Sequence, residues 1–226
     1  MITRLELRDV SRTYHLDEQR IPALHDVSLI AEAGTVTVLV GRSGCGKSTL
    51  LNLAGAMDFP DSGEVLIDGH STTGLNDRQL TELRRDRIGF VFQSFQLLPT
   101  LTALENVELP LLLARKGNSE QTARERLRWV GLEGRERSLP HQLSGGQMQR
   151  VAVARALVRQ PDILIADEPT GNLDTASGDE VLRLLQRAAR ELGATLLMAT
   201  HSREAAAIAD VLVSLRDGRI ESVERS

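Results

Sequence analysis

The sequence has little cysteine, few aromatic residues and no excess of positive charge, and each shortage excludes a class of protein. Only one of its 226 residues is a cysteine, Cys45, which excludes an internal disulfide and a cysteine-cluster metal site. Aromatic residues make up 3% of the chain, too few for surfaces on which nucleic-acid bases stack. A formal net charge of −4, with scattered basic residues, indicates that nucleic acid is not a partner.

Long apolar runs are also missing. No stretch approaches the roughly 18 to 20 apolar residues that a membrane-spanning helix needs. The N-terminal segment MITRLELRDV lacks the apolar stretch of a signal peptide. We therefore expect the chain to stay in the cytoplasm. Its 41% of hydrophobic residues is an ordinary content for a globular protein and allows a sizeable core.

The first third of the sequence predicts a β-rich lobe. Its strand-like segments LELRDVSRTYHL, VSLIAEAGTVTVLVG and GEVLIDG are each bounded by Gly, Asp or Pro turn signals. The β-branched run TVTVLV ends at Gly41, and the following KSTLLNLAGAM has the pattern of a helix. The chain here is predicted to form a strand, a glycine loop and a helix in succession.

From about residue 94 to 160 the pattern is helical. Thr102, followed three residues later by Glu105, marks one helix start, and Ser119 ahead of TARERLRWV marks another. This segment is predicted to be a helical insert.

After the insert, strands return as DILIADE and ATLLMATH. The helix between them has a predicted capping box of Ser177 with Glu180 and a predicted C-cap at Gly193. Its apolar face consists of Val181, Leu184, Leu185, Ala188 and Leu192. Alternating strands and helices indicate a parallel sheet. The terminal VLVSLRDGRIESV predicts a hairpin that turns at Asp217-Gly218.

Residues Gly41 to Ser48 fit the pattern G-x-x-x-x-G-K-[ST]. The glycines of this pattern let backbone N–H groups converge on phosphates at a helix N-terminus, Lys47 reaches the terminal phosphates, and Ser48 faces Mg²⁺. The flanking strand and helix are the context that this mechanism requires. Cys45 is interpreted as a small loop residue; the alternative is a reactive thiol, because a helix N-terminus lowers a thiol pKa.

The segment ILIADE is an apolar strand that delivers Asp167 and Glu168 at its carboxyl end, where open α/β sheets bind ligands. Beside a phosphate loop, Asp167 is suited to hold Mg²⁺ and Glu168 to activate water. The alternative is a pair of solvated acids that close a strand.

The segment LSGGQ, residues 143–147, predicts a second anion site. It places an exposed serine hydroxyl and exposed glycine amides at the start of a helix, MQRVAVARALVRQ, that stops before Pro161. There are two alternatives for a chain with two such sites. Either each site binds its own ligand, or the second site closes over a nucleotide held by another copy of the chain.

The segments GRSGCGKST, LSGGQ and ILIADEPT, together with Asn172-Leu173-Asp174 and His201, resemble the nucleotide-binding subunit of an ABC transporter over essentially the whole chain. The resemblance implies an α/β fold, namely the P-loop NTPase fold of ABC ATPases. This fold has a mixed β-sheet core, an N-terminal antiparallel β lobe and a helical subdomain at about 94–160, within a single domain of residues 1–226. It also implies ATP hydrolysis, with ATP and Mg²⁺ bound. In that family two subunits dimerise head-to-tail, and the signature segment of one completes the phosphate site of the other.

The resemblance assigns roles to individual positions. The residues implied to bind the nucleotide are Tyr14, which stacks on adenine, and Gly41, Arg42, Ser43, Gly44, Cys45, Gly46, Lys47, Ser48, Thr49 and Gln93. Those implied to hold Mg²⁺ are Ser48, Gln93 and Asp167. Those implied to be catalytic are Glu168, His201 and Lys47. Those implied to act on the partner's site are Ser144, Gly145, Gly146 and Gln147, with Asp174 communicating across the dimer.

The stretches FVFQSFQLLPTLTALENVELPLLL and DEPTGNLD resemble the branch of lipoprotein-release, macrolide-efflux and cell-division ABC ATPases. This implies a homodimer bound to an integral membrane permease subunit, peripheral on the inner face of the cell membrane. Transport and mechanical transmission both stay open, as do the substrate, its direction and the identity of the membrane partner. The candidates for the groove that receives this partner are Phe95, Leu97, Leu98 and Leu104, with core packing as the alternative.

Two positions depart from the family pattern: Ser202 stands where an acid usually follows the histidine, and HLDEQR after Tyr14 lacks the usual glycine. Soluble ABC-type ATPases that act on DNA ends or ribosomes share the motifs, but this chain has neither their long coiled coil nor their second nucleotide domain. The presence of Glu168 and His201 argues against the interpretation that the chain binds ATP without hydrolysing it.

Overall fold

The central sheet has six strands in the order β10-β9-β3-β8-β7-β6 in a computed structural model that describes residues 2–17 and 19–225. Its parallel strands are β9 (Val211–Arg216), β3 (Val36–Val40), β8 (Thr195–Ala199), β7 (Ile163–Asp167) and β6 (Ile88–Phe92). β10 (Arg219–Arg225) pairs antiparallel with β9, which makes the sheet mixed, as predicted. Asp217 and Gly218 between them both have positive φ, so the predicted hairpin turn is confirmed.

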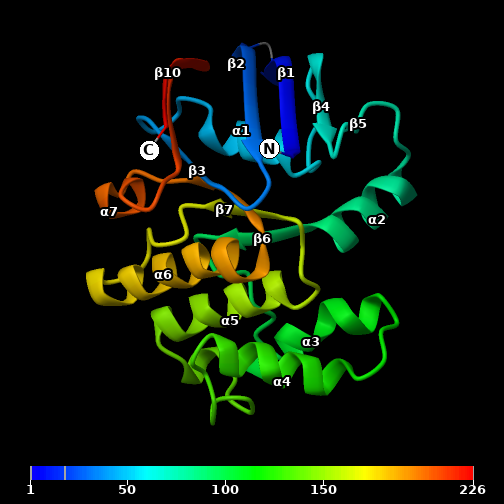
Figure 1. The fold of residues 1–226 in the computed structure, drawn as a ribbon, viewed down its shortest axis with the longest axis vertical. Coiled ribbons are helices and arrows are strands. Elements are labelled where there is room, and N and C mark those ends of the chain that lie inside the picture. The colour runs from blue at the N-terminus through cyan, green and yellow to red at the C-terminus, as the bar shows by residue number, and fades with distance from the viewer. Residues whose placement is uncertain (1, 18, 226) are drawn as a thin grey trace.

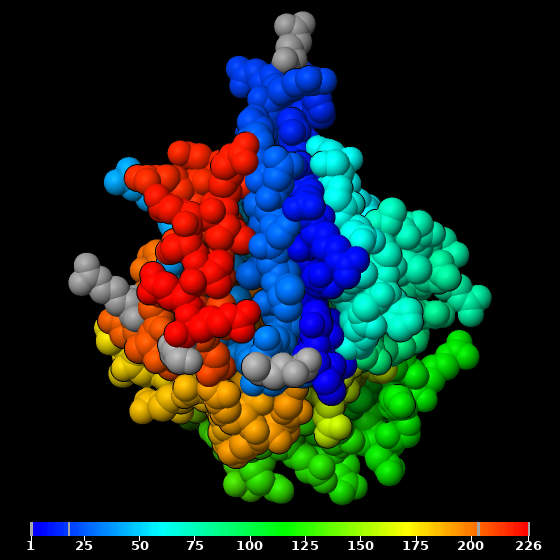
Figure 2. All heavy atoms as spheres, turned by 45° about the horizontal axis from the view of Figure 1, so that its top comes forward, coloured from blue at the N-terminus to red at the C-terminus, as the bar shows by residue number. Residues whose placement is uncertain are grey.

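A second sheet is antiparallel and contains four strands in the order β2-β1-β4-β5. They are β1 (Thr3–Leu16), β2 (Gln19–Glu32), β4 (Ser62–Ile67) and β5 (His70–Ser71). In Figure 2, β10, β2, β1 and β4 lie side by side across one face of the molecule. Helix α1 (Lys47–Ala54) is buried between the two sheets, because its Leu50, Leu51 and Leu53 share one apolar cluster with residues of both.

The remaining helices lie mainly at the opposite end of the molecule from the antiparallel sheet (Figure 1). Residues 94–160, all of them described, contain helices but no strand: α3 (Ala103–Leu113), α4 (Ser119–Trp129), the 3₁₀ helix η1 (Pro140–Gln142) and α5 (Gly145–Leu157). The others are α2 (Asp77–Arg87), α6 (Thr175–Leu192) and α7 (Arg203–Ala206). Among the described helices none is long and apolar enough to cross a membrane.

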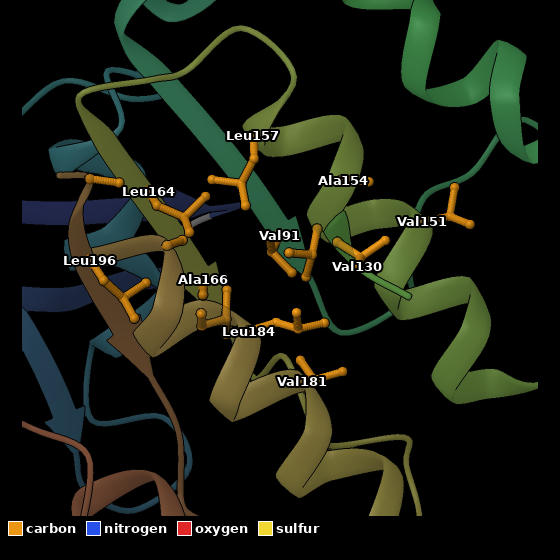
Figure 3. Packing of buried hydrophobic residues seen from close by; sticks show 14 of the residues in the cluster. Val91, Val130, Val151, Ala154, Leu157, Leu164, Ala166, Val181, Leu184 and Leu196 are labelled. Carbon is orange, nitrogen blue, oxygen red and sulfur yellow. The ribbon is translucent and has the colours of Figure 1, made fainter. Parts of the chain in front are cut away.

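The larger core lies between the central sheet and helices α5 and α6. Figure 3 shows Val91, Leu164 and Leu196 from three strands facing Leu157 of α5 and Leu184 of α6. This packing holds α5 and α6 against the sheet.

One predicted helix start differs in the structure, and a second has a different cap. Asp174, not Ser177, is the N-cap of α6, and its side chain accepts a hydrogen bond from the Ser177 amide. The predicted capping box of Ser177 with Glu180 is therefore wrong, because a better-placed carboxylate starts the helix one turn earlier. Helix α4 begins at Ser119, as its pattern indicated, but its N-cap is Asn118 in a left-handed conformation.

Candidate functional site

The residues predicted to bind nucleotide meet at the carboxyl ends of adjacent parallel strands. β3 leads into the loop 41–46, β8 ends just before His201, β7 ends at Asp167, and β6 ends just before Gln93. With Tyr14 from β1, these segments surround a cleft of about 720 Å³. Its lining residues in the described chain are Tyr14, Ile21, Pro22, Ala23, Gly41, Arg42, Ser43, Gly44, Gly46, Lys47, Ser48, Thr49, Gln93, Glu168 and His201.

Two glycines of the loop occupy positions that no other residue fits. Gly41 and Gly46 have φ values of 154° and 104°. A Cβ atom on Gly41 would lie 2.3 Å from the carbonyl oxygen of Leu215, and one on Gly46 would lie 2.5 Å from that of Ala23. The loop is thus held against two neighbouring backbones, with Gly46 at the start of α1.

The Lys47 side chain lies within the loop. Its Nζ donates hydrogen bonds to the carbonyl oxygens of Gly41, at 2.8 Å, and of Arg42, at 3.2 Å. Cys45 is buried beside it and is the only predicted nucleotide-binding residue that is not among the described residues lining the cleft. This burial supports the small-residue interpretation of Cys45 over the reactive thiol.

Asp167 is half-buried at the end of β7 and carries an unsatisfied oxygen. Burial raises the pKa of its carboxyl above the usual range; the Ser48 hydroxyl opposes the rise and the Glu168 carboxylate adds to it. Its Oδ1 is buried and has no hydrogen-bond partner among the residues that the structure describes. An orphaned carboxylate oxygen next to a hydroxyl is a suitable environment for a hard cation.

Glu168 and His201 contact each other across the end of the sheet. Glu168 has a φ of 46°, and its amide donates to the carbonyl oxygen of Ala199 at 2.9 Å. This turn brings Glu168 Oε1 to 2.9 Å from His201 Nδ1. The sequence did not predict this contact, although the parallel pairing of β7 with β8 was the signal that could have indicated it.

Gln93 is held by Asn172 through a reciprocal pair of hydrogen bonds. The Gln93 amide donates to Asn172 Oδ1 at 3.1 Å, and the Asn172 amide donates to the Gln93 carbonyl oxygen at 3.2 Å. Gly171 lies against the same side chain, since a Cβ atom there would be 2.7 Å from Gln93 Nε2. The anchoring role of Asn172 is a further feature that sequence reasoning missed.

The signature segment, residues 143–147, lies apart from this cleft. Ser144 caps α5, and its Oγ accepts a hydrogen bond from the Gln147 amide at 3.2 Å while Gln147 Oε1 accepts one from the Ser144 amide. The prediction of exposed glycines is wrong for Gly146. It is buried against α6, where a Cβ atom would lie 2.7 Å from Ser177 Oγ. No signature residue is among the described residues that line the cleft.

Asp174 and Ser202 both act as helix caps. Asp174 accepts hydrogen bonds from the Ser177 amide at 3.0 Å and the Ser177 hydroxyl at 2.8 Å, and these bonds lower the pKa of its carboxyl. Ser202, which replaces the acid usual in the family, accepts a hydrogen bond from the Ala205 amide at the start of α7. Ser202 thus has a local structural role as the cap of α7.

Comparisons with known proteins agree with one another. Residues 24–171 match the family model described as ABC transporter. The chain is 49% identical to an uncharacterized ABC transporter ATP-binding protein of Thermotoga maritima, covering 98% of this chain and 95% of the relative. It is 47% identical to the macrolide export ATP-binding/permease protein MacB of Syntrophobacter fumaroxidans, over 96% of this chain but 31% of the relative.

A solved structure has the same fold. It is the dimeric ATP-binding cassette MJ0796 of Methanocaldococcus jannaschii in a post-hydrolysis state bound to ADP and Pi. It superposes with a TM-score of 0.91 at 44% identity and covers 98% of both chains. The predicted fold class, including the mixed sheet and the antiparallel N-terminal lobe, is confirmed.

Proposed function

Because the chain belongs to the ABC transporter family and is an ATPase of that family, we propose that two copies dimerise head-to-tail and drive a membrane partner. In this proposal residues 1–226 form one ATP-binding domain whose helical subdomain spans about 94–160. The observation that carries the proposal is the separation of the signature segment from the cleft of its own chain. A second copy in the opposite orientation supplies the missing half of each site.

ATP binds in the cleft with its base against Tyr14 and its phosphates in the loop 41–49. Lys47 faces the terminal phosphates, where it exchanges its carbonyl contacts within the loop for charge-assisted hydrogen bonds to phosphate oxygens. Ser144, Gly145 and Gly146 of the second copy close over the γ-phosphate, with Gln147 supporting them through its bond to Ser144. Asp174 lies in the segment that faces the other copy.

The residues Ser48, Gln93 and Asp167 would hold Mg²⁺. The fit is supported by the orphaned Asp167 Oδ1 and by a donor set made entirely of oxygen atoms: hydroxyl, amide carbonyl and carboxylate. When bound, Mg²⁺ neutralises part of the phosphate charge. A donor set with a single half-buried carboxylate would suit Mg²⁺, which proteins bind through few carboxylates.

The contact between Glu168 and His201 supports the proposed hydrolysis step. Glu168 accepts a proton from the attacking water, which adds to the γ-phosphorus as the bond to the β-phosphate oxygen breaks. Lys47 and His201 stabilise the negative charge on the phosphoryl oxygens. Water is thereby consumed, and ADP and inorganic phosphate leave.

A membrane permease partner is supported by an arginine-lined apolar groove of about 420 Å³ beside Gln93. Its apolar lining includes Phe90, Phe92, Leu109, Pro110 and Leu113, and four arginines line it as well: Arg84, Arg85, Arg155 and Arg159. We assign it to a short amphipathic helix of the permease, whose apolar face would pack against these apolar residues. Phe92 lines the groove and the next residue, Gln93, lines the nucleotide cleft, so a permease helix bound in the groove would lie next to the nucleotide site.

The groove differs from the one suggested by sequence. Leu104 is 8% exposed and belongs to the core, and none of Phe95, Leu97, Leu98 and Leu104 is among the described residues that line the groove. The name of the MacB relative joins an ATP-binding and a permease function in one longer chain. By analogy, we place this chain on the inner face of the cell membrane, where it is peripheral and bound through its membrane partner.

The test of the proposed function is Glu168→Gln, which keeps the shape of the side chain but removes the base. Steady-state ATP turnover is expected to fall by about 10² to 10⁴, while ATP binding persists and a dimer accumulates. Light scattering with ATP measures the dimer. Glu133→Gln, at an exposed glutamate that pairs with Arg128, is the matched control. Parent-like turnover in Glu168→Gln would exclude Glu168 as the base.

A further inference from the structure

The ring of Tyr14 is fixed by two neighbouring charged side chains. Its hydroxyl donates a hydrogen bond to Asp58 Oδ2 at 3.0 Å. The guanidinium carbon of Arg12 lies over the ring, 5.0 Å from its centroid. A hydroxyl bond and a cation–π contact together restrict both torsions of the tyrosine side chain.

The two charged residues form one network. Arg12 Nε and Nη2 donate to the two oxygens of Asp58 at 3.1 and 2.9 Å, and Arg12 Nη1 donates to Asp61 Oδ1 at 2.7 Å. The Arg12 and Asp58 side chains are 24% and 23% exposed, so the pair is shielded from most of the solvent. A bidentate arginine–carboxylate pair of this kind has a fixed geometry.

The network also connects the ring to the phosphate loop. The Met57 and Asp58 amides both donate to the carbonyl oxygen of Asn52 in the last turns of α1. Helix α1 begins at Lys47, at the end of the loop. Helix α1 therefore connects the two: the phosphate loop lies at its start, and Asp58, which holds Tyr14, is bonded to its last turns.

The local strand geometry brings the side chains together. The pairing of β1 with β2 is irregular between Val10 and Arg12 and again between Arg12 and Thr13. Such irregularities re-aim side chains and occur frequently near binding sites. Tyr14 lines the cleft, whereas Arg12 is not among its described lining residues, so the guanidinium covers one ring face and the other is left for a base.

We propose that Arg12 and Asp58 are positioning residues that hold Tyr14 as a preformed platform for the adenine ring. This inference rests on the proposed placement of the base against Tyr14. A ring that is already ordered loses no rotamer freedom when the base stacks on it. Loss of the network is expected to weaken ATP binding roughly two- to tenfold, the equivalent of ordering one side chain.

The test compares ATP with inorganic tripolyphosphate, which has phosphates but no base. Arg12→Ala and Tyr14→Phe are expected to weaken binding of ATP in calorimetry and to leave tripolyphosphate binding unchanged. Turnover should show a raised KM for ATP with an unchanged kcat. Arg8→Ala is the matched control, because Arg8 lies on the same strand in an exposed pair with Glu6 and Glu64.

Two results would overturn the inference. One is parent-like ATP affinity in both variants. The other is an equal loss of ATP and tripolyphosphate binding, which would mean that the network supports the loop instead of the ring. Tyr14→Phe keeps the ring and its contact with Arg12, so it remains informative if Arg12→Ala fails to fold.

Tyr14 is the only tyrosine in the sequence, so ¹³C-tyrosine labelling gives NMR ring signals from this residue alone. In the parent, ATP should shift these signals and tripolyphosphate should not. If ATP does not shift the signals, adenine does not stack on Tyr14, and the positioning role of Arg12 and Asp58 is excluded as well. If ATP shifts the signals but Arg12→Ala and Tyr14→Phe bind ATP like the parent, adenine stacks on Tyr14 and only the positioning role of Arg12 and Asp58 is excluded.

Discussion

The contact between Glu168 and His201 determines which ring nitrogen carries a proton. A carboxylate oxygen accepts hydrogen bonds, so the 2.9 Å contact forms with the His201 tautomer that carries its proton on Nδ1. The neutral ring then has an acceptor at Nε2. In the proposed mechanism His201 donates to a phosphate oxygen, which requires either an imidazolium or the release of Glu168. The release would also free the carboxylate oxygen that accepts the proton of water.

Lys47 is the residue whose removal most directly tests the phosphate site. Lys47→Ala should weaken ATP binding roughly 10- to 100-fold, because one or more charge-assisted hydrogen bonds to phosphate are lost. Calorimetry with ATP measures the effect. Lys116→Ala removes the same charge from the exposed turn after α3 and is expected to bind ATP like the parent. Equal affinity of Lys47→Ala and the parent would place the phosphates elsewhere.

The strands and turns were predicted better than the helix starts. β3, β7 and β8 are nearly continuous apolar runs, and a parallel strand buried on both faces has this pattern. The start of α6 was wrong because Asp174 and Ser177 are both good capping residues, and the choice between them depends on how α6 packs. Gly146 lies against Ser177, which places the first turn of α6 under the start of α5.

The cap of α6 predicts a pH dependence of stability. Hydrogen bonds from Ser177 lower the pKa of Asp174 below its ordinary value of 3.8. A carboxyl with a lowered folded pKa stabilises the fold above its unfolded pKa, and this contribution is lost as pH falls through the folded pKa. Asp174→Asn keeps the capping oxygen but does not titrate. The stability of the parent relative to this variant should therefore fall as the pH drops below about 5 and on through the lowered folded pKa of Asp174.

Urea unfolding of both proteins at several pH values measures this difference. A constant difference between the parent and Asp174→Asn across this range would mean that the charge of Asp174 does not contribute to the cap.

The arrangement of the whole molecule explains which site residues were predictable. The strand pattern was enough to predict that the loop, Asp167 and Glu168 lie at one edge of the sheet, whereas Gln93 and His201 were assigned to the site by the family resemblance. The parallel strands bring all of them to the same edge. The pairs Glu168–His201 and Gln93–Asn172 were not predictable, since residues 33 and 79 positions apart meet only once the strand order is known. The separation of residues 143–147 from the cleft likewise depends on the packing of α5.

That separation predicts that ATP binding and ATP turnover can be uncoupled. Ser144→Arg places a bulky side chain where the second copy's γ-phosphate would dock, and leaves the loop 41–49 of its own chain unchanged. ATP binding to the monomer should be nearly intact, while dimerisation and hydrolysis are lost. Calorimetry measures ATP affinity, and light scattering with ATP measures the dimer.

The substitution also removes a helix cap, because Ser144 Oγ accepts from the Gln147 amide. Loss of a cap costs about 0.5–2 kcal/mol of stability. Thr102→Ala removes the equivalent cap of α3, which is built from the same type of capping box with Glu105. The Thr102→Ala variant should lose a similar amount of stability but dimerise and hydrolyse ATP like the parent. Any loss of dimerisation or hydrolysis in Ser144→Arg is then due to the signature segment and not to the lost cap. If Ser144→Arg lost monomer ATP binding as severely as Lys47→Ala, the signature segment would serve the nucleotide of its own chain and the head-to-tail arrangement would be wrong.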